Sequence, residues 1–465
     1  MPLPSEILTN KFPYTPTSGQ LQLFKTVDHF LESSDKPVMM IRGYAGTGKT
    51  TVVSTLTQVL PLFNYKYVLL APTGRAAKVI SSYAKRLAFT IHKKIYKQTA
   101  EDGGSPRFEN QRNYSKKTVF IVDESSMINE AVGFTSKSLL SDLLRYVFTH
   151  DSNKLILIGD NAQLPPVGQS VSPALDLEYL RSNFDVTLFE SILTEVTRQA
   201  ENSGILKNAT QLREQLLTDK PSIKINTQGE SDIFKMTGEK MEDGLRYAYD
   251  NYGVENTIII TRSNQQANNY NQYIRHRIHF YEEELEAGEL LMVVRNNYLH
   301  SPGEQTGNFI ANGDFVVVQK IVSFESMYGL RFATLMLQLI DYPDSEPFEA
   351  KVILDTLHSP GPALEESVNK QLYELVKQDY MDLPTKKEQR EAIKKDPYLN
   401  ALQVKFAYAL TCHKSQGGQW PIVFVDQGYL KETEMDKDYV KWLYTAITRA
   451  TEQLFLVNFN KTLVR

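Results

Sequence analysis

The chain of 465 residues is predicted to be an α/β protein with two parallel-sheet domains, a small insertion in the first and a β-barrel inserted in the second. Three observations lead to this prediction. Short apolar runs rich in Val and Ile alternate with longer helical patterns, as in sheets whose parallel strands are joined by helices. Two sets of such runs occur, and a long stretch divides the second set. Within that stretch, polar and apolar residues alternate as in half-buried antiparallel strands.

The first set of apolar runs predicts the sheet of domain 1. Each run ends in Gly, Ala or an acidic residue, as parallel strands do where the loops beyond their carboxyl ends carry function. We expect domain 1 to cover 1–92 and 118–185, with a polar, turn-rich insertion at 93–117. The runs are VMMIRG (38–43), YVLLA (67–71), TVFIVDE (118–124) and KLILIGD (154–160).

The second set predicts domain 2, over 186–291 and 401–465. The insertion at 292–400 is expected to hold a small β-barrel near 292–356 and then a charged helical extension at 362–400, where Lys and Glu recur at helical spacing. The runs of the second set are NTIIITRSN (256–264), KFAYALTCH (405–413), PIVFVDQ (421–427) and QLFLVNF (453–459).

Composition indicates an intracellular protein with one strongly basic segment. The single cysteine, Cys412, permits neither an intramolecular disulfide nor a cysteine-based metal cluster. No apolar run approaches the ~20 residues of a membrane span, so we expect a soluble, cytoplasmic protein. The net charge is −4, but residues 36–100 contain eleven Lys and Arg and no Asp or Glu, so the rest of the chain carries −15. Such a block can bind an anion that the net charge conceals.

The segment GYAGTGKT (43–50) predicts a phosphate site. It follows an apolar run and precedes a helical pattern, which is the setting of the GxxxxGK[ST] loop, or P-loop. Its glycines let backbone N–H groups face phosphate oxygens, and the start of the helix adds the positive end of its dipole. Lys49 is expected to reach the β- and γ-phosphates of ATP, and the Thr50 hydroxyl is expected to ligate Mg²⁺.

An acid pair, an amide and two arginines are expected to complete the catalytic set. Asp123 and Glu124 end the run TVFIVDE, where Asp123 would hold Mg²⁺ and Glu124 would polarise the attacking water. Gln163 lies beyond a third strand end, where its amide would sense the γ-phosphate. Arg198 and Arg449 would act as arginine fingers, because an arginine from a second α/β domain couples domain closure to the transition state.

The segment DYVKWLYTAITRA is expected to be helical, with Arg449 near its end and outside its core-facing stripe. Val440, Leu443, Tyr444 and Ile447 recur at helical spacing and form the predicted core face. Arg449 lies off this stripe and is therefore expected to be free to point at the phosphates.

Eight segments occur in the order of the superfamily 1 helicase motifs and resemble the B subgroup, which includes RecD, TraA and phage Dda. The resemblance spans residues 20–451. It implies two RecA-like parallel-sheet motor domains, an SH3-like barrel in the second, and an ATP-driven motor that moves 5′ to 3′ on single-stranded DNA. The chain is also related to the Pif-type helicases, although the signature peculiar to that type is not recognisable after VDESSM. The segments are GYAGTGKT, APTGRAAKVI, TIHKKI, VDESSM, GDNAQLPPV, EVTRQ, YALTCHKSQGGQW and YTAITRAT.

The resemblance also implies roles for individual residues at the nucleotide. Gln20 would read adenine, although Thr17 to Gln20 also fits a capping box that opens a helix. Gly418 would let the backbone approach the nucleotide closely. The residues implied to cradle the phosphates are Gly46, Thr47, Gly48, Lys49, Thr50 and Thr51.

A second group of residues would grip single-stranded DNA, chiefly through phosphate contacts. It lies in APTGRAAKVI, TIHKKI and LTCHKSQG, so the track would cross both domains. Aromatic residues of the insertions are candidates for base stacking or for a strand-separating pin, and none is singled out; examples are Tyr96, Phe108, Tyr114 and Tyr298. The DNA-contact residues are Thr73, Gly74, Arg75, Lys78, His92, Thr411, His413, Lys414, Ser415 and Gln416.

The leading hypothesis is an ATP-dependent helicase that acts on single-stranded DNA and on junctions of single- and double-stranded DNA. We expect a monomer in a bacterium or a phage-infected cell, working in DNA replication, recombination or repair. Nuclease, single-strand-binding or replisome proteins are its expected partners. Three alternatives stay open: a DNA-stimulated translocase that serves as a motor subunit and unwinds weakly alone, a non-translocating NTP switch, and an RNA helicase.

Overall fold

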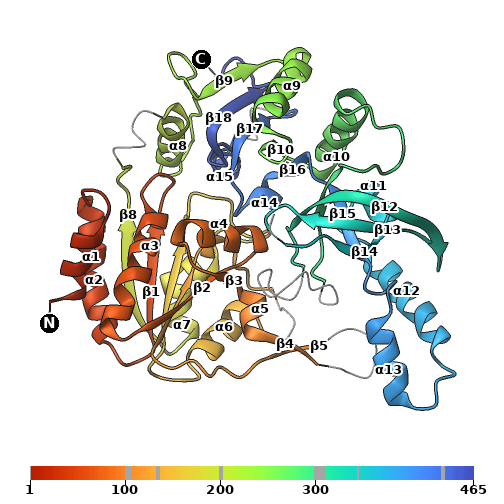
Figure 1. The fold of residues 1–465 in the computed structure, drawn as a ribbon. Helices are drawn as coiled ribbons and strands as arrows, with labels where there is room; N and C mark the ends of the chain where they lie inside the picture. Colours follow the sequence, from red (N-terminus) through yellow and green to blue (C-terminus); the bar gives the residue numbers. More distant parts are fainter. Residues whose placement is uncertain are drawn as a thin grey trace.

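Two parallel sheets and a closed barrel make up the computed structural model, which describes residues 2–99, 107–131, 137–197, 203–297, 310–342, 345–430 and 435–464. The two sheets with their helices lie at opposite ends of the molecule, and the barrel lies to one side of their junction (Figure 1). The predicted fold class is therefore confirmed: two parallel-sheet α/β domains, with a barrel inserted in the second.

The first domain is a six-stranded sheet, ordered β3-β2-β6-β7-β1-β8, with helices on both faces. Side chains alternate along each strand, so Met39 and Ile41 pack under α1 to α4, while Val38 and Met40 pack under α5 to α7. The strands are β1 Pro37–Gly43, β2 Lys66–Ala71, β3 Ala88–Thr90, β6 Thr118–Val122, β7 Lys154–Gly159 and β8 Thr187–Leu193. The helices are α1 Pro4–Lys11, α2 Ser18–Glu32, α3 Lys49–Val59, α4 Gly74–Ala84, α5 Ile91–Ile95, α6 Leu139–Val147 and α7 Leu177–Asn183.

The small insertion of the first domain is an antiparallel pair, β4 Tyr96–Thr99 with β5 Arg107–Asn110. Of the aromatic residues considered for a pin, Tyr96 is buried and Tyr114 is exposed. The others, the Phe108 side chain and Tyr298, lie outside the described part of the chain.

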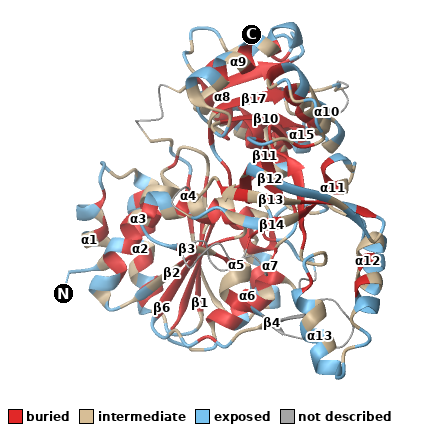
Figure 2. Ribbon diagram, turned by 45° about the vertical axis from the view of Figure 1, so that its right-hand side comes forward, coloured by how far each residue is buried: buried red, intermediate tan, exposed pale blue. Residues whose placement is uncertain are grey.

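The second domain is a five-stranded sheet, ordered β16-β10-β17-β18-β9, and every strand pair in it is parallel. Figure 2 shows its strands as a buried layer between partly exposed helices. The strands are β9 Ile233–Met236, β10 Thr257–Thr261, β16 Ala409–Thr411, β17 Trp420–Asp426 and β18 Ala450–Val457. The helices are α8 Gly204–Gln215, α9 Met241–Tyr252, α10 Asn264–Tyr273, α14 Cys412–Ser415 and α15 Lys437–Ile447.

The inserted barrel closes through a parallel contact between β14 and β15, whereas its other neighbours pair antiparallel. The charged helical extension stands at the outer side of the barrel (Figure 1). The barrel strands are β11 Leu290–Val293, β12 Phe315–Met327, β13 Leu330–Leu339, β14 Phe348–Ile353 and β15 Leu402–Phe406. The helices of the insertion are α11 Asp355–His358, α12 Glu366–Asp379 and α13 Lys386–Lys395.

Three strands belong to a different sheet or barrel from the one that the predicted domain boundaries assign them to. β8 pairs in parallel with β1, so the first sheet extends beyond the predicted end at residue 185. The barrel begins with β11 and closes with β15, so it is wider than the predicted insertion 292–400. The apolar pattern identifies a strand but not the neighbour with which it pairs, which is why these boundaries differ. Among the described helices, none has the length and apolar character needed to cross a membrane.

A buried ion pair fixes the segment that leads from the second domain into the barrel. The guanidinium of Arg275 donates to the Glu289 carboxylate at 2.6 and 2.8 Å and to the Glu283 carbonyl at 2.6 Å. Both side chains are almost fully buried. Burial outweighs the attraction of Arg275 and raises the pKa of Glu289 to about 7. Removing one partner therefore leaves a buried group without its counter-charge, which is costly.

Arg275→Ala is expected to lower the free energy of unfolding by about 3 kcal/mol, measured by chemical denaturation. Without Arg275 the pKa of Glu289 rises further, so the folded state binds a proton more readily and the deficit should shrink as pH falls. The matched control is Arg246→Ala, which removes an exposed pair with Glu242 and should cost less than ~1 kcal/mol. Equal losses of unfolding free energy in the two variants would contradict a stabilising role for the buried Arg275–Glu289 pair.

Candidate functional site

The P-loop joins β1 to α3 and adopts the backbone that a phosphate cradle needs. Gly46 and Gly48 have φ of +76° and +81°, a left-handed conformation that favours glycine. The Lys49 ammonium donates to the carbonyls of Gly43 at 2.7 Å and Tyr44 at 2.9 Å. These bonds fold the lysine over its own loop, from which it has only to turn outward to reach a phosphate.

Gln20 holds the P-loop from the neighbouring helix α2. Its side-chain oxygen accepts from the Thr17 N–H at 3.0 Å, and its side-chain nitrogen donates to the Thr47 carbonyl at 3.0 Å. The predicted capping box is therefore present, and the side chain is fully buried. A Cβ on Gly48 would lie 2.7 Å from the Gln20 nitrogen. Gln20 thus shapes the loop, and its role in reading adenine stays a prediction.

The acid pair follows β6, next to β7 in the sheet. Glu124 has φ of +52°, an uncommon conformation for a residue with a side chain and one that is often found at functional sites. Loss of hydration and the neighbouring Glu124 carboxylate raise the pKa of Asp123 to about 6, against the influence of Lys49. The Asp123 carboxylate and the Thr50 hydroxyl are oxygen donors of the kind Mg²⁺ prefers. This donor set fits a bound Mg²⁺.

Gln163 lies in the loop after β7, and its amide oxygen is buried. That oxygen has no hydrogen-bond partner within the described part of the chain. A buried acceptor of this kind is satisfied by a ligand or a water molecule. The predicted role of Gln163 as a sensor of the γ-phosphate stays a prediction.

Residues of the second domain hydrogen-bond to the P-loop and to the loop after β7 of the first domain. The Tyr444 hydroxyl, from α15, accepts from the Ala45 N–H of the P-loop at 2.8 Å and donates to the Asp160 carboxylate at 2.6 Å. The Leu164 N–H donates to the Thr445 hydroxyl at 2.7 Å. The helical spacing places Tyr444 on the core face, where it is indeed buried, but it does not reveal these bonds. The available signal was that a buried tyrosine hydroxyl usually finds a partner.

The expectation that Arg449 is free of the core is wrong. Its side chain is only 3% exposed, and it donates to the carbonyls of Thr445 at 3.1 Å and Gly418 at 3.3 Å. The helical stripe did not reveal this because α15 ends at Ile447 and the chain turns before Arg449. The other finger candidate, Arg198, lies outside the described residues.

Helix α4, which carries the first predicted DNA grip, packs against the barrel and the second domain. The Arg75 guanidinium lies between the rings of Phe315 and Trp420, 4.4 and 4.0 Å from their centroids. Lys78 forms an ion pair with Asp341 of the segment after β13, at 3.0 Å. Both predicted phosphate contacts are thus engaged within the protein, an arrangement that depends on packing between distant segments.

The start of α4 meets the second domain through small residues. Thr73 caps the helix by accepting from the Ala76 N–H, and a Cβ on Gly74 would lie 2.2 Å from Asp314. A Cβ on Gly418 would lie 2.5 Å from Trp420 and 2.9 Å from Arg75. Gly418 therefore packs against α4, and its predicted approach to the nucleotide stays a prediction.

The predicted grip of the second domain divides into buried and accessible residues. Ser415 and Gln416 are buried; the Ser415 hydroxyl donates to the Cys412 carbonyl, and the Gln416 amide donates to the Leu164 carbonyl at 2.7 Å. Neither can meet a strand in this conformation, which corrects the prediction for these two. Thr411, His413 and Lys414 remain partly or fully accessible, as His92 does in the first domain. Burial lowers the pKa of His92 to about 4, so it is neutral near pH 7.

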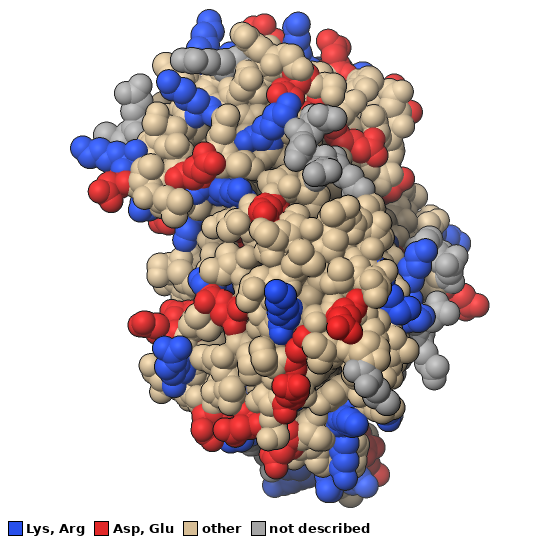
Figure 3. Space-filling model, turned by 90° about the vertical axis from the view of Figure 1, so that its left-hand side faces the viewer, with Lys and Arg blue, Asp and Glu red and all other residues tan. Residues whose placement is uncertain are grey.

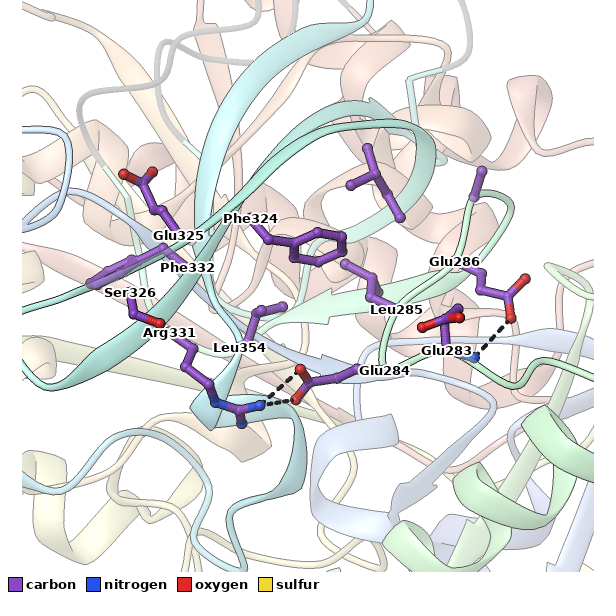
Figure 4. A pocket seen from close by; sticks show the side chains of 12 residues that line it. Glu283, Glu284, Leu285, Glu286, Phe324, Glu325, Ser326, Arg331, Phe332 and Leu354 are labelled. Atoms are coloured by element: carbon purple, nitrogen blue, oxygen red, sulfur yellow. Dashed lines mark hydrogen bonds and ion pairs between the residues drawn. The ribbon is translucent and has the colours of Figure 1, made fainter.

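The described residues of one further face and one cavity can be compared with the P-loop as sites for phosphate. Lys, Arg, Asp and Glu are interspersed over the face in Figure 3. A cavity of about 830 Å³ lies between the loop 283–287 and the β12–β13 hairpin of the barrel (Figure 4). Phe324 and Leu285 line it together with carboxylates, and Glu284 is paired with Arg331 at 2.8 Å. Its acidic lining repels phosphates.

Two family models match the chain. One described as an AAA domain covers residues 17–224, and one described as a UvrD-like helicase C-terminal domain covers residues 406–457. Together they cover the P-loop, the acid pair, Gln163 and the helix α15.

Several proteins resemble the chain in sequence. An uncharacterized protein of Acanthamoeba polyphaga mimivirus is 25% identical over 94% of this chain and 98% of its own length. The ATP-dependent DNA helicase dda of Enterobacteria phage T4 is 31% identical over 42% of each chain. The ATP-dependent RecD2 DNA helicase of Deinococcus radiodurans is 29% identical over 37% of this chain and 21% of its own. The chain thus matches less than half of the length of each of these two helicases.

Solved structures of Pif1 helicases are distant likenesses. The Bacteroides protein in complex with ADP-AlF3 and ssDNA is 16% identical over 95% of this chain and 93% of its own, with a TM-score of 0.48. The Candida albicans protein is 15% identical over 96% of this chain and 95% of its own, with a TM-score of 0.47.

Gly48→Ala is expected to weaken nucleotide binding by about tenfold or more, because the new methyl group strains the backbone and meets Gln20. Binding of a fluorescent ATP analogue measures this. Gly168→Ala is the matched control, since Gly168 has the same φ of +81° but nothing within 4 Å of its Cβ position. The control carries the same backbone strain and should bind nucleotide normally. Equal loss in both variants would show that the contact with Gln20 is unimportant.

Proposed function

Because the chain belongs to superfamily 1 of the helicases, as its helicase C-terminal match and its RecD2 and dda relatives indicate, we propose that it is an ATP-driven DNA helicase. It moves 5′ to 3′ on single-stranded DNA and separates duplex ahead of it. The observation that carries the proposal is the nucleotide site itself. P-loop, acid pair and Gln163 share one edge of the first sheet, and hydrogen bonds from the second domain enter that edge.

Hydrolysis in this proposal depends on positioning and on neutralising charge. Lys49 leaves the carbonyls of its own loop and binds the β- and γ-phosphates. Thr50 and Asp123 would hold Mg²⁺, and a bound Mg²⁺ would neutralise charge on the phosphates. Glu124 accepts a proton from the attacking water, and Gln163 orients that water through its buried amide oxygen.

Arg449 acts from the second domain when the domains close on the nucleotide. Arg449 is held by backbone carbonyls beside the site, so it must exchange these bonds for phosphate oxygens. Arg198 supplies the second cation. Together they stabilise the charge of the transition state.

DNA is gripped in this proposal by both domains at once. Arg75 and Lys78 exchange the rings and the Asp341 carboxylate for DNA phosphates, and His413 and Lys414 form the grip of the second domain. Closure on ATP shifts one grip relative to the other, and hydrolysis resets it. We further propose that the protein works as a monomer in the cytoplasm, at junctions of single- and double-stranded DNA, with replication, recombination or repair proteins as partners.

Glu124→Gln is expected to keep nucleotide binding within about twofold and to lower kcat for ATP hydrolysis by at least ~100-fold, because the proton acceptor is lost while the shape is kept. Steady-state phosphate release and analogue binding measure the two effects. Lys49→Ala is the contrasting variant and should lose both. Substantial turnover in Glu124→Gln would refute the role of Glu124.

Unwinding of tailed duplexes tests the proposed direction. Duplexes with a 5′ tail should be separated in the presence of ATP and Mg²⁺, whereas blunt and 3′-tailed duplexes should stay paired. Separation of only the 3′-tailed duplex would overturn the polarity. Stimulation of ATP hydrolysis by DNA with no unwinding would favour a motor subunit, and hydrolysis indifferent to DNA would favour a switch. RNA of the same sequence is the control for the choice of nucleic acid.

A further inference from the structure

The hydroxyl of Tyr444 belongs to the second domain but lies inside the nucleotide site of the first. It accepts from the Ala45 N–H and donates to Asp160, and both Tyr444 and Asp160 are 1% exposed. Burial and the Asp160 carboxylate raise the pKa of Tyr444 well above its usual value, so the phenol keeps its proton and donates it to Asp160. A hydrogen bond to a buried carboxylate is among the stronger kinds.

Asp160 is also hydrogen-bonded within the loop that contains Gln163. Its second carboxylate oxygen accepts from the Ala162 N–H at 2.9 Å, and its carbonyl accepts from the Gln163 N–H at 3.2 Å. One hydroxyl of the second domain therefore ties two catalytic loops of the first, the P-loop and the Asp160–Leu164 loop. The strands that lead into these loops, β1 and β7, are paired neighbours in the first sheet, and the Tyr444 hydroxyl adds a direct link between the loops themselves.

Packing alone does not require this hydroxyl. Tyr439 lies on the same helix and is also buried, and its hydroxyl has no hydrogen-bond partner in the part of the chain that the structure describes. On this helix the Tyr439 ring is buried without a partner for its hydroxyl among the described residues, whereas the buried Tyr444 hydroxyl has two partners. The second arrangement is specific, because each partner lies in a different loop of the other domain.

We propose that the Tyr444 hydroxyl is a positioning group that aligns the P-loop with the Gln163 loop when the domains close, and so makes hydrolysis depend on closure. The inference rests on the proposed ATPase activity and adds a residue to it. The Tyr444 hydroxyl acts through Ala45 and Asp160, its two hydrogen-bond partners. ATP binding depends mainly on the P-loop itself, so loss of the hydroxyl should affect turnover more than binding.

The test is steady-state ATP hydrolysis by Tyr444→Phe with saturating single-stranded DNA. We expect kcat to fall about tenfold, which corresponds to ~1.4 kcal/mol, and KM for ATP to stay within about twofold. The matched control Tyr439→Phe should retain kcat. The double variant Tyr444→Phe/Asp160→Asn should be no slower than Asp160→Asn alone, because the hydroxyl acts through Asp160.

The outcomes separate this inference from the proposed function. If the wild-type protein shows no DNA-stimulated hydrolysis, the proposed function fails. If the wild-type protein is stimulated but Tyr444→Phe keeps its kcat, the role of the hydroxyl is refuted. A fall in kcat shared by Tyr439→Phe, or accompanied by an equal loss of analogue binding and a lowered Tm, would show a structural role and likewise overturn the inference.

Discussion

The hydrogen bonds between helix α15 and the loop Asp160–Leu164 are the contact on which the rest of the molecule depends. The apolar core of the second domain includes Ala162 and Leu164 of the first, so the two domains are joined at the loop after β7. At that junction Tyr444 and Thr445 bond to the P-loop and to the loop after β7. The Gln416 amide donates to the Leu164 carbonyl, while the Leu164 N–H donates to Thr445. The nucleotide site is therefore assembled from both domains.

The same junction connects the predicted grip on DNA with the nucleotide site. Gln416 directly follows His413, Lys414 and Ser415, and its amide holds the Leu164 carbonyl next to Gln163. On the other side, α4 meets the barrel and the second domain through Arg75 and Lys78. A strand that displaces these contacts changes the same interface that holds the catalytic loops, which is a physical route from DNA to hydrolysis.

The strands, the P-loop and the acid pair could be predicted from the sequence because these features depend on local patterns. An apolar run with glycines after it predicts the β1–P-loop–α3 unit with no knowledge of the rest of the chain, and the alternation in 315–353 likewise predicts the barrel strands. Gln20 was predicted with two roles, and only its cap could be read from local spacing. The engagement of Arg75 and Gln416 within the protein depends on segments hundreds of residues away, and no local pattern carries that information. Arg449 bonds to the nearer carbonyls of Thr445 and Gly418, but the turn after α15 that sets this contact is not visible in the helical stripe. The basic block 36–100 shows the same limit, since its charges at Lys49, Arg75 and Lys78 are satisfied by partners that folding supplies.

Hydrogen exchange at the Leu164 amide is the most direct test of a nucleotide site shared between domains. This N–H donates across the junction to Thr445, and Pro165 after it contributes no amide signal. The account predicts that exchange of the peptide containing Leu164 slows when a non-hydrolysable ATP analogue binds, and slows further with single-stranded DNA. Exchange that is unchanged or faster with both ligands bound would contradict a junction that closes on the nucleotide.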